Sequence, residues 1–194
     1  MAWIRIDDDD RSIKDHESVT EFLAECGISY ERWELDDRVS ADADDQTILE
    51  AYDPEIQRLK AEGGYTTADV VCITPQTPNL DALLEKFSKE HTHSEDEIRF
   101  AIKGSGVFYI NPDNGPVFAI YMEAGDMIGV PKGTQHWFHM CDDHNIRCIR
   151  LFEDPSGWVA NYVDEGLHAG FQPVCWGPNY IPPNTVDVKN IVQP

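Results

Sequence analysis

The chain has 194 residues, a length that suits one domain with a sizeable hydrophobic core. Its 15 Lys and Arg against 36 Asp and Glu give a formal net charge of −21, which argues against nucleic acids and anionic membranes as partners. No apolar run approaches the roughly 18 residues of a membrane span, and no basic N-terminus leads into an apolar stretch. These features predict a globular, cytoplasmic protein.

The cysteines do not form a recognisable framework. Their number, five, is odd, and no Cys-x-x-Cys pair occurs. The sequence therefore argues against both a disulfide scaffold and a thiolate zinc site. We expect reduced thiols, in agreement with a cytoplasmic location.

Helical patterns dominate the N-terminal part of the chain. Residues 19–26 place apolar side chains at helical spacing, and Gly27 is positioned to end that helix. Residues 48–59 follow the same period, and Pro54 is expected to kink or divide the helix. A third helix is predicted to begin at an Asn79 cap.

From about Ala68 the pattern changes to short β-rich segments separated by Gly, Pro, Asn and Asp. Strands are expected at residues 70–73, 97–102, 106–110, 117–122, 127–130, 136–140, 146–152 and 158–162. Many short strands separated by turns predict a sandwich or barrel, and the preceding helices predict a helical layer on one side. We therefore expect a single, mainly β domain, with residues 1–67 as a helical N-terminal layer, 68–165 as the barrel and 166–194 as an irregular tail.

Histidine and carboxylate residues gather in two of these segments. In an extended segment His91 and His93 point the same way, and Glu97 and Arg99 share their parity. A further histidine, His136, follows the turn residues Pro-Lys-Gly-Thr-Gln. Three imidazoles and one carboxylate suit iron(II), nickel, manganese or copper and are less specific for zinc. The sequence predicts one divalent metal, and four protein ligands leave an octahedral ion two positions for a chelating substrate.

The two segments resemble the two conserved motifs of cupins. Residues 91–104, HTHSEDEIRFAIKG, resemble the first motif, and residues 125–136, GDMIGVPKGTQH, resemble the second. The sequences of these motifs are similar to those of the acireductone dioxygenase family in particular, and the similarity extends over roughly residues 40–164. The resemblance implies a cupin double-stranded β-helix, a jelly-roll barrel, with flanking N-terminal α-helices.

The resemblance also implies a reaction and roles for single residues. The family cleaves an acireductone, 1,2-dihydroxy-3-oxo-5-(methylthio)pent-1-ene, with O2 in methionine salvage, and it uses Fe(II) or Ni(II). Matching positions imply His91, His93, Glu97 and His136 as metal ligands. They also imply Arg99 as a substrate-orienting residue, and Phe138 and Trp158 as lining of the substrate pocket.

Alternatives stay open at this point. The chain could be another cupin oxygenase or isomerase, or a non-catalytic cupin that binds a small ligand, because a fold does not determine an activity. Arg99 could be only a buried ion-pair partner of Glu97 or of another acid, and Phe138 and Trp158 could be core residues. The sequence predicts neither the native metal nor a general base, and it leaves the oligomeric state open, with a monomer compatible.

Overall fold

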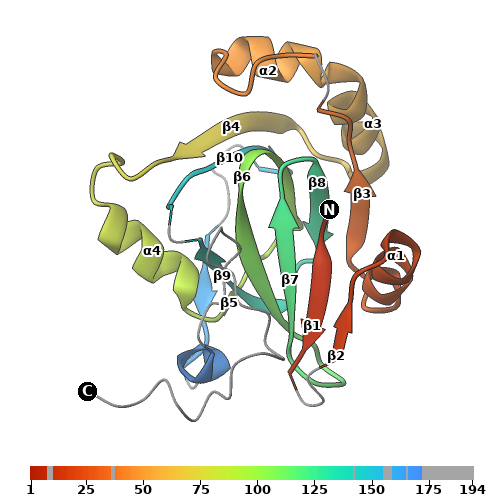
Figure 1. Cartoon of the computed structure of the whole chain (residues 1–194), viewed down its shortest axis with the longest axis vertical. Helices are drawn as coiled ribbons and strands as arrows, with labels where there is room; N and C mark the ends of the chain where they lie inside the picture. The colour runs from red at the N-terminus through yellow and green to blue at the C-terminus, as the bar shows by residue number, and fades with distance from the viewer. Residues whose placement is uncertain (8–10, 36–37, 142, 155–158, 165, 172–194) are drawn as a thin grey trace.

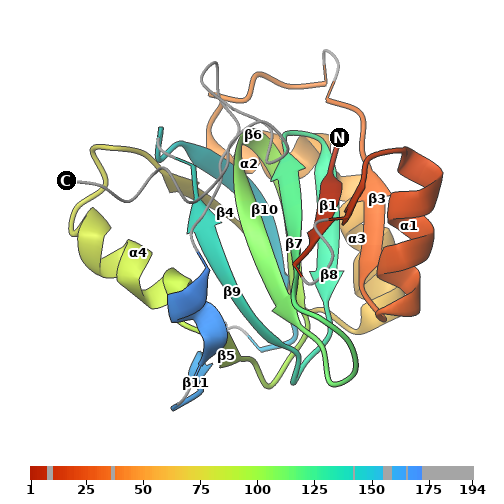
Figure 2. The ribbon, with the colours of Figure 1, turned by 60° about the horizontal axis from the view of Figure 1, so that its bottom comes forward.

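A computed structural model of the chain describes residues 1–7, 11–35, 38–141, 143–154, 159–164 and 166–171. Its strands form two antiparallel sheets that share one long strand, β6 (Glu97–Asn111). Figures 1 and 2 show the sheets facing each other as the two walls of a barrel. No helix within the described residues is long and apolar enough to span a membrane.

The two sheets have the following strand orders. The first sheet runs β11 (Asn161–Tyr162), β5 (His91–Thr92), β9 (Gln135–Met140), β6, β7 (Phe118–Glu123), β1 (Trp3–Ile6) and β2 (Arg11–Ile13). The second runs β4 (Thr67–Ile73), β10 (Ile146–Phe152), β6, β8 (Asp126–Val130) and β3 (Ser29–Arg32). The predicted mainly β cupin barrel is confirmed.

Strand β6 passes from one sheet to the other at Gly104. Its residues up to Gly104 pair with β10 and β8, and those from Ser105 onward pair with β7 and β9. Gly104 has φ +80°, and a Cβ there would lie 1.7 Å from the carbonyl oxygen of Asn145. Only glycine fits this bend. The sequence suggested two strands, residues 97–102 and 106–110; the structure corrects this to one strand bent at that point.

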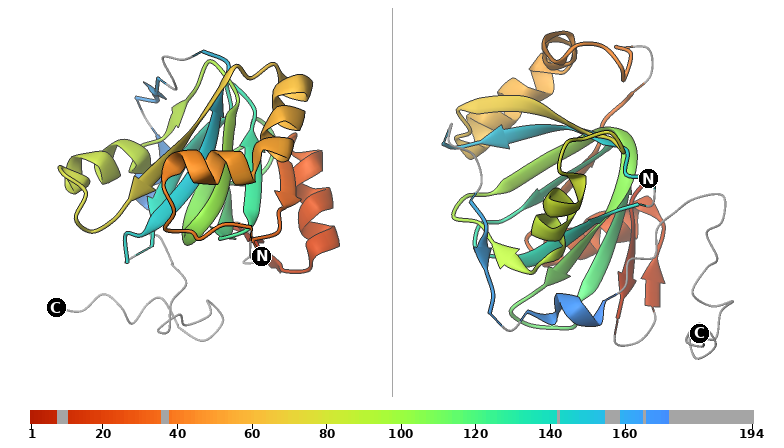
Figure 3. Two further views of the ribbon diagram at one scale, coloured as in Figure 1. Left: turned by 90° about the horizontal axis from the view of Figure 1, so that it is seen from above. Right: turned by 90° about the vertical axis from the view of Figure 1, so that its left-hand side faces the viewer.

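Up to Gly104, the side chains of β6 alternate between the barrel interior and the outer helices. Ile98 and Phe100 pack with Tyr52 in an apolar cluster between the second sheet and helices α2 (Asp45–Ala51) and α3 (Asp53–Gly63). Figure 3 shows these two helices lying across the outside of that sheet. Glu97 and Arg99, which have the opposite parity, therefore face the interior of the barrel.

The helices follow the sequence patterns closely. Helix α1 (His16–Glu25) ends just before Gly27, as predicted. Pro54 divides the second pattern, and it lies in the first turn of α3, where a missing N–H costs no hydrogen bond. Helix α4 (Leu80–Ser88) begins after Asn79, although the Asn79 side chain makes no capping hydrogen bond. A short 3-10 helix, η1 (Leu167–Gly170), lies in the segment to which the sequence assigned no structure.

Strands β1, β2 and β3 were not predicted. β1 extends the first sheet by pairing with β7, and β3 extends the second by pairing with β8. Ile4 is buried in the barrel core, and Trp3 stacks on Tyr121 with the ring centroids 3.9 Å apart. Residues 1–67 thus contribute strands as well as helices. The division of the chain at residues 67 and 165 stays a prediction.

Within the described residues no disulfide joins the cysteines, which are Cys26, Cys72, Cys141 and Cys148. Cys175 lies outside the described residues. Cys148 is fully buried in the barrel core, and burial raises the pKa of its thiol to about 11. The neutral thiol acts there as a small apolar side chain.

Candidate metal centre

Three strands and two turns bring the predicted ligands together. His91 of β5 lies directly opposite His136 of β9 in the sheet register. The chain bends after His93, so residues 91–99 are not one continuous strand, and Glu97 begins β6. The N–H of Gly133 donates to the His93 carbonyl (2.9 Å), which fixes the turn before β9 against the first motif.

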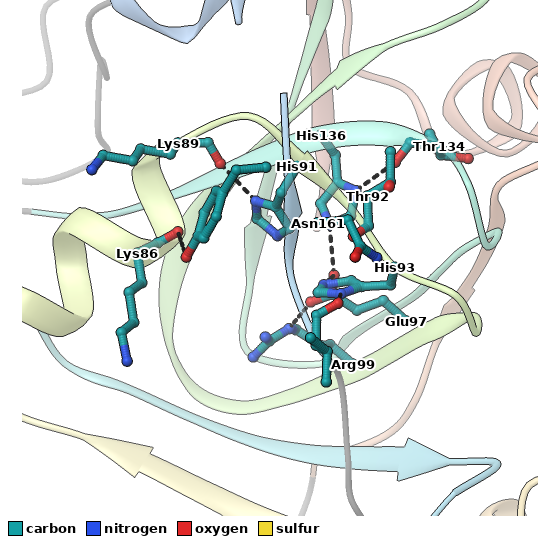
Figure 4. A network of polar contacts seen from close by, with 12 residues as sticks. Lys86, Lys89, His91, Thr92, His93, Glu97, Arg99, Thr134, His136 and Asn161 are labelled. Carbon is teal, nitrogen blue, oxygen red and sulfur yellow. Dashed lines mark hydrogen bonds and ion pairs between the residues drawn. The ribbon is translucent and has the colours of Figure 1, made fainter. Parts of the chain in front are cut away.

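The ring nitrogens of the three histidines converge on one point. One potential ligand nitrogen from each of His91, His93 and His136 lies within 4.8 Å of the others. The Glu97 carboxylate joins them, with its Oε2 2.8 Å from Nε2 of His136 and 3.3 Å from Nε2 of His93. All four side chains are buried, and Figure 4 shows the three imidazoles and Glu97 pointing toward one another. The structure thus brings together all four residues that the sequence singled out.

Hydrogen bonds fix the orientation of each imidazole. Nδ1 of His91 lies 2.6 Å from the Lys89 carbonyl oxygen, Nδ1 of His136 lies 2.8 Å from that of Thr134, and Nδ1 of His93 lies 3.0 Å from that of Val159. Because a carbonyl only accepts, we assign the ring proton to Nδ1 in each case. The Nε2 lone pairs then face one another and the Glu97 carboxylate.

This donor set fits a divalent cation. Lone pairs of neutral imidazoles directed at a carboxylate oxygen repel it unless positive charge lies between them. Metal-bound histidines commonly donate their other ring N–H to a carbonyl or carboxylate, as these three do. Imidazole nitrogens with one carboxylate oxygen match the preferences of first-row divalent metals. The donors therefore have both the orientation and the chemistry of a single metal site.

Without a metal, a proton on Nε2 of His136 or His93 takes the place of the cation beside Glu97, and the pKa values of the site reflect that state. Burial, followed by the charge of His136, lowers the pKa of His91 to about 4. Burial alone would raise the pKa of Glu97, but the charge of Arg99 and the hydrogen bonds from His136 and His93 hold it well below its usual range. Burial opposes protonation of His93 as well, yet hydrogen bonding to Glu97 raises its pKa. The carboxylate is thus ionised, and His91 is neutral at physiological pH.

A cavity of about 530 Å³ opens beside the metal centre. Arg99 and Phe138, both singled out by the sequence, line it. Arg99 Nε donates to Oε1 of Glu97, the carboxylate oxygen that does not face the histidines. The ion pair that the sequence left as an alternative role for Arg99 is therefore present alongside its place in the cavity wall. Trp158 lies outside the described residues.

The cavity has further lining residues that the sequence analysis missed. Its aromatic wall is completed by Phe87, Phe108, Phe152 and Tyr162, and its charged lining includes Asp69, Lys86 and Arg150. Strand parity could have identified Arg150 and Phe152, since they alternate in β10 with the apolar Ile149 and Leu151. Asp69 gave no signal, because its position opposite β10 depends on a register that the sequence does not encode.

The barrel and its buried histidine centre define the chain as a metal-binding cupin. The model of the ARD/ARD' family matches residues 1–160. The chain therefore belongs to the acireductone dioxygenase (ARD/ARD') family. The predicted family and enzyme class are thereby confirmed.

Curated relatives and a solved structure have the same family name. An acireductone dioxygenase of Aquifex aeolicus is 41% identical over 161 residues, covering 83% of this chain and 87% of the relative. An acireductone dioxygenase of Marinobacter nauticus is 44% identical over 155 residues, which cover 80% of this chain and 83% of the relative. The structure of acireductone dioxygenase from Bacillus anthracis, with a cadmium ion in its active centre, aligns with a TM-score of 0.77 and 37% identity, covering 84% of this chain and 98% of that one.

Proposed function

We propose that the chain is the acireductone dioxygenase of methionine salvage, cleaving 1,2-dihydroxy-3-oxo-5-(methylthio)pent-1-ene with O2. The observation that carries the proposal is the buried cluster of His91, His93, His136 and Glu97 beside a cavity that contains Arg99. A cavity that combines aromatic walls with converging polar groups is a common form of a small-molecule site. Membership of the ARD/ARD' family supports the same activity.

His91, His93, Glu97 and His136 are the proposed ligands of one divalent metal. The carbonyl partners of the three imidazoles hold the rings in the binding tautomer before the ion arrives. Arg99 holds Glu97 through Oε1 and so leaves Oε2 for the metal. When bound, a divalent cation favours the anionic enediolate form of the substrate, which is the form that reacts with O2.

Arg99, Phe138 and Trp158 are the residues proposed to bind and orient the substrate. Arg99 presents a planar guanidinium that is suited to an enolate oxygen. Phe138 packs against Phe108, with ring centroids 4.8 Å apart, and offers an apolar surface to the methylthio tail. Trp158 is the second proposed pocket residue. The rings of Phe108 and Phe138 shield the bound substrate from water on their side of the cavity, which strengthens its electrostatic contacts.

The product set is expected to depend on the metal. With Fe(II) the expected products are formate and 4-methylthio-2-oxobutanoate. With Ni(II) they are formate, carbon monoxide and 3-methylthiopropanoate. The substrate and O2 are the expected partners, and the location is expected to be the cytoplasm.

The test removes the metal by chelation, reloads the protein with Fe(II) or Ni(II), and supplies acireductone and O2. We expect O2 uptake with both metals and carbon monoxide in the headspace with Ni(II) only. Equal products from both metals would contradict the metal dependence while retaining the dioxygenase. Absence of O2 uptake with either metal, with the ion bound, would favour a non-catalytic ligand-binding cupin.

A further inference from the structure

Three charged residues lie side by side across three strands of the second sheet. In the register, Asp69 of β4 lies opposite Arg150 of β10, and Arg150 lies opposite Arg99 of β6. All three line the cavity beside the metal centre. Glu97, two residues before Arg99, continues this row toward the histidines. A polar row thus leads from the cavity rim to the metal ligands in the order Asp69, Arg150, Arg99, Glu97.

Two arginines directly opposite each other in a sheet repel. Each of them therefore has its own carboxylate. Arg99 donates to Glu97, and Arg150 donates through Nε and one terminal nitrogen to the two Asp69 oxygens, at 2.8 and 2.6 Å. The pairs differ in depth, because the Arg99 and Glu97 side chains are 12% and 4% exposed whereas those of Arg150 and Asp69 are 26% and 47% exposed.

Because the two ion pairs differ in burial, we infer different roles for Arg99 and Arg150. The carboxylate of Glu97 faces buried imidazoles, so Arg99 acts at the metal centre. Asp69 is half exposed, and water screens its charge. Two hydrogen bonds to Asp69 hold the Arg150 guanidinium in one place at the cavity wall. The charged lining of the cavity then has three cations, Lys86, Arg99 and Arg150, against the two carboxylates of Asp69 and Glu97.

We propose that Arg150 is a positioning residue that captures the anionic substrate at the cavity rim, with Asp69 as the residue that orients it. The inference rests on the proposed function, since it takes an enediolate as the ligand. A chain with a formal net charge of −21 repels such an anion at long range. Local positive charge on the path to the metal offsets that repulsion. Arg150 therefore contributes to substrate binding, and the reaction itself proceeds at the metal and Arg99.

The test compares two variants that break the same ion pair but change the charge in opposite directions. Arg150→Gln should raise KM roughly three- to tenfold with little change in kcat, the size expected for one partly screened charge near an anion. Asp69→Asn should not raise KM, because the asparagine keeps one side-chain oxygen that accepts from Arg150 while the rim becomes more positive. The double variant should lie between the two. The effect of Arg150→Gln should also shrink at high salt.

A second measurement does not depend on turnover. Calorimetric titration of the metal-loaded protein with oxalate, a chelating dianion, should give weaker binding for Arg150→Gln by a similar factor. Arg58→Gln is the matched control, since it also removes an arginine that is paired with carboxylates but lies outside the cavity. Its KM and oxalate affinity should equal those of the native chain.

The outcomes separate the proposals. A rise in KM for both Arg150→Gln and Asp69→Asn would show that the pair serves only the structure and would overturn the inference. An unchanged KM and unchanged oxalate binding in Arg150→Gln would overturn it as well. Lack of turnover by the native chain would instead contradict the proposed function, and the oxalate titration would still decide whether Arg150 captures anions.

Discussion

Replacing Arg99 by alanine is expected to damage both the metal centre and the reaction. Arg99 Nε donates to the Glu97 carboxylate, and both side chains are almost completely buried. The variant leaves an ionised carboxylate in a buried position without its cation. Because the charge of Arg99 is the largest influence that keeps the Glu97 pKa low, the variant should also raise that pKa.

The magnitude follows from this burial. Removing one partner of a buried ion pair typically costs about 3–5 kcal/mol of unfolding free energy. We expect a loss of that order in the metal-free protein, reduced when a bound cation compensates the charge of Glu97. Loss of a charge-assisted contact to the reacting substrate typically costs about 2–4 kcal/mol, which is roughly a 30- to 900-fold fall in turnover.

The assays are urea unfolding, metal content and O2 uptake with acireductone. Arg99→Ala should retain its metal at neutral pH but release it at a higher pH than the native chain during acidification, since Glu97 becomes easier to protonate. Arg99→Lys should restore the stability and metal affinity more than the turnover, because an ammonium supplies the charge without the planar fork. Native stability, metal affinity and turnover in Arg99→Ala would refute this reasoning.

Further predictions concern the metal, pH and the bend in β6. His93→Ala should lose most of the metal found in the native protein by elemental analysis, and full retention would show that His93 is not a ligand. Metal-free protein should lose up to about 3 kcal/mol of stability as pH falls from 6.5 toward 4, because the His91 pKa is about 4 when folded and 6.5 when unfolded. Urea unfolding should show this loss, and His91→Gln should reduce it. Gly104→Ala should yield little folded protein by circular dichroism, because its Cβ would overlap the Asn145 carbonyl.

The sequence predicted the metal-ligand cluster better than the sheet around it. Spacing within each motif, together with the family resemblance, identified the three histidines and Glu97, which the structure brings together. The reason given for Glu97 was incomplete, since a bend, and not one extended strand, carries it to the site. Helices were equally clear, because apolar periodicity and a proline or glycine mark them locally.

Features that depend on distant partners were missed. Strand β1 has only four residues, a length at which local alternation is a weak signal, so its pairing with β7 defines it. The same holds for the pairing of Asp69 with Arg150, which are 81 residues apart in the chain. Local patterns cannot encode such a register, since it depends on how β4, β10 and β6 align after the barrel closes.

The carbonyl groups that accept from the three histidines come from two parts of the chain. Two of them are local to the strands of the metal centre, and the third belongs to the segment after β10. His91 and His136 are each held by the carbonyl of the residue two positions earlier, so their orientation is a local property of β5 and β9. His93 is held by the carbonyl of Val159, 66 residues away. That segment is attached by the pairing of β11 with β5 and by the Val163 N–H, which donates to the Glu90 carbonyl. Two ligands are therefore fixed once the barrel forms, whereas the third takes its final orientation only when the chain beyond β10 returns to β5.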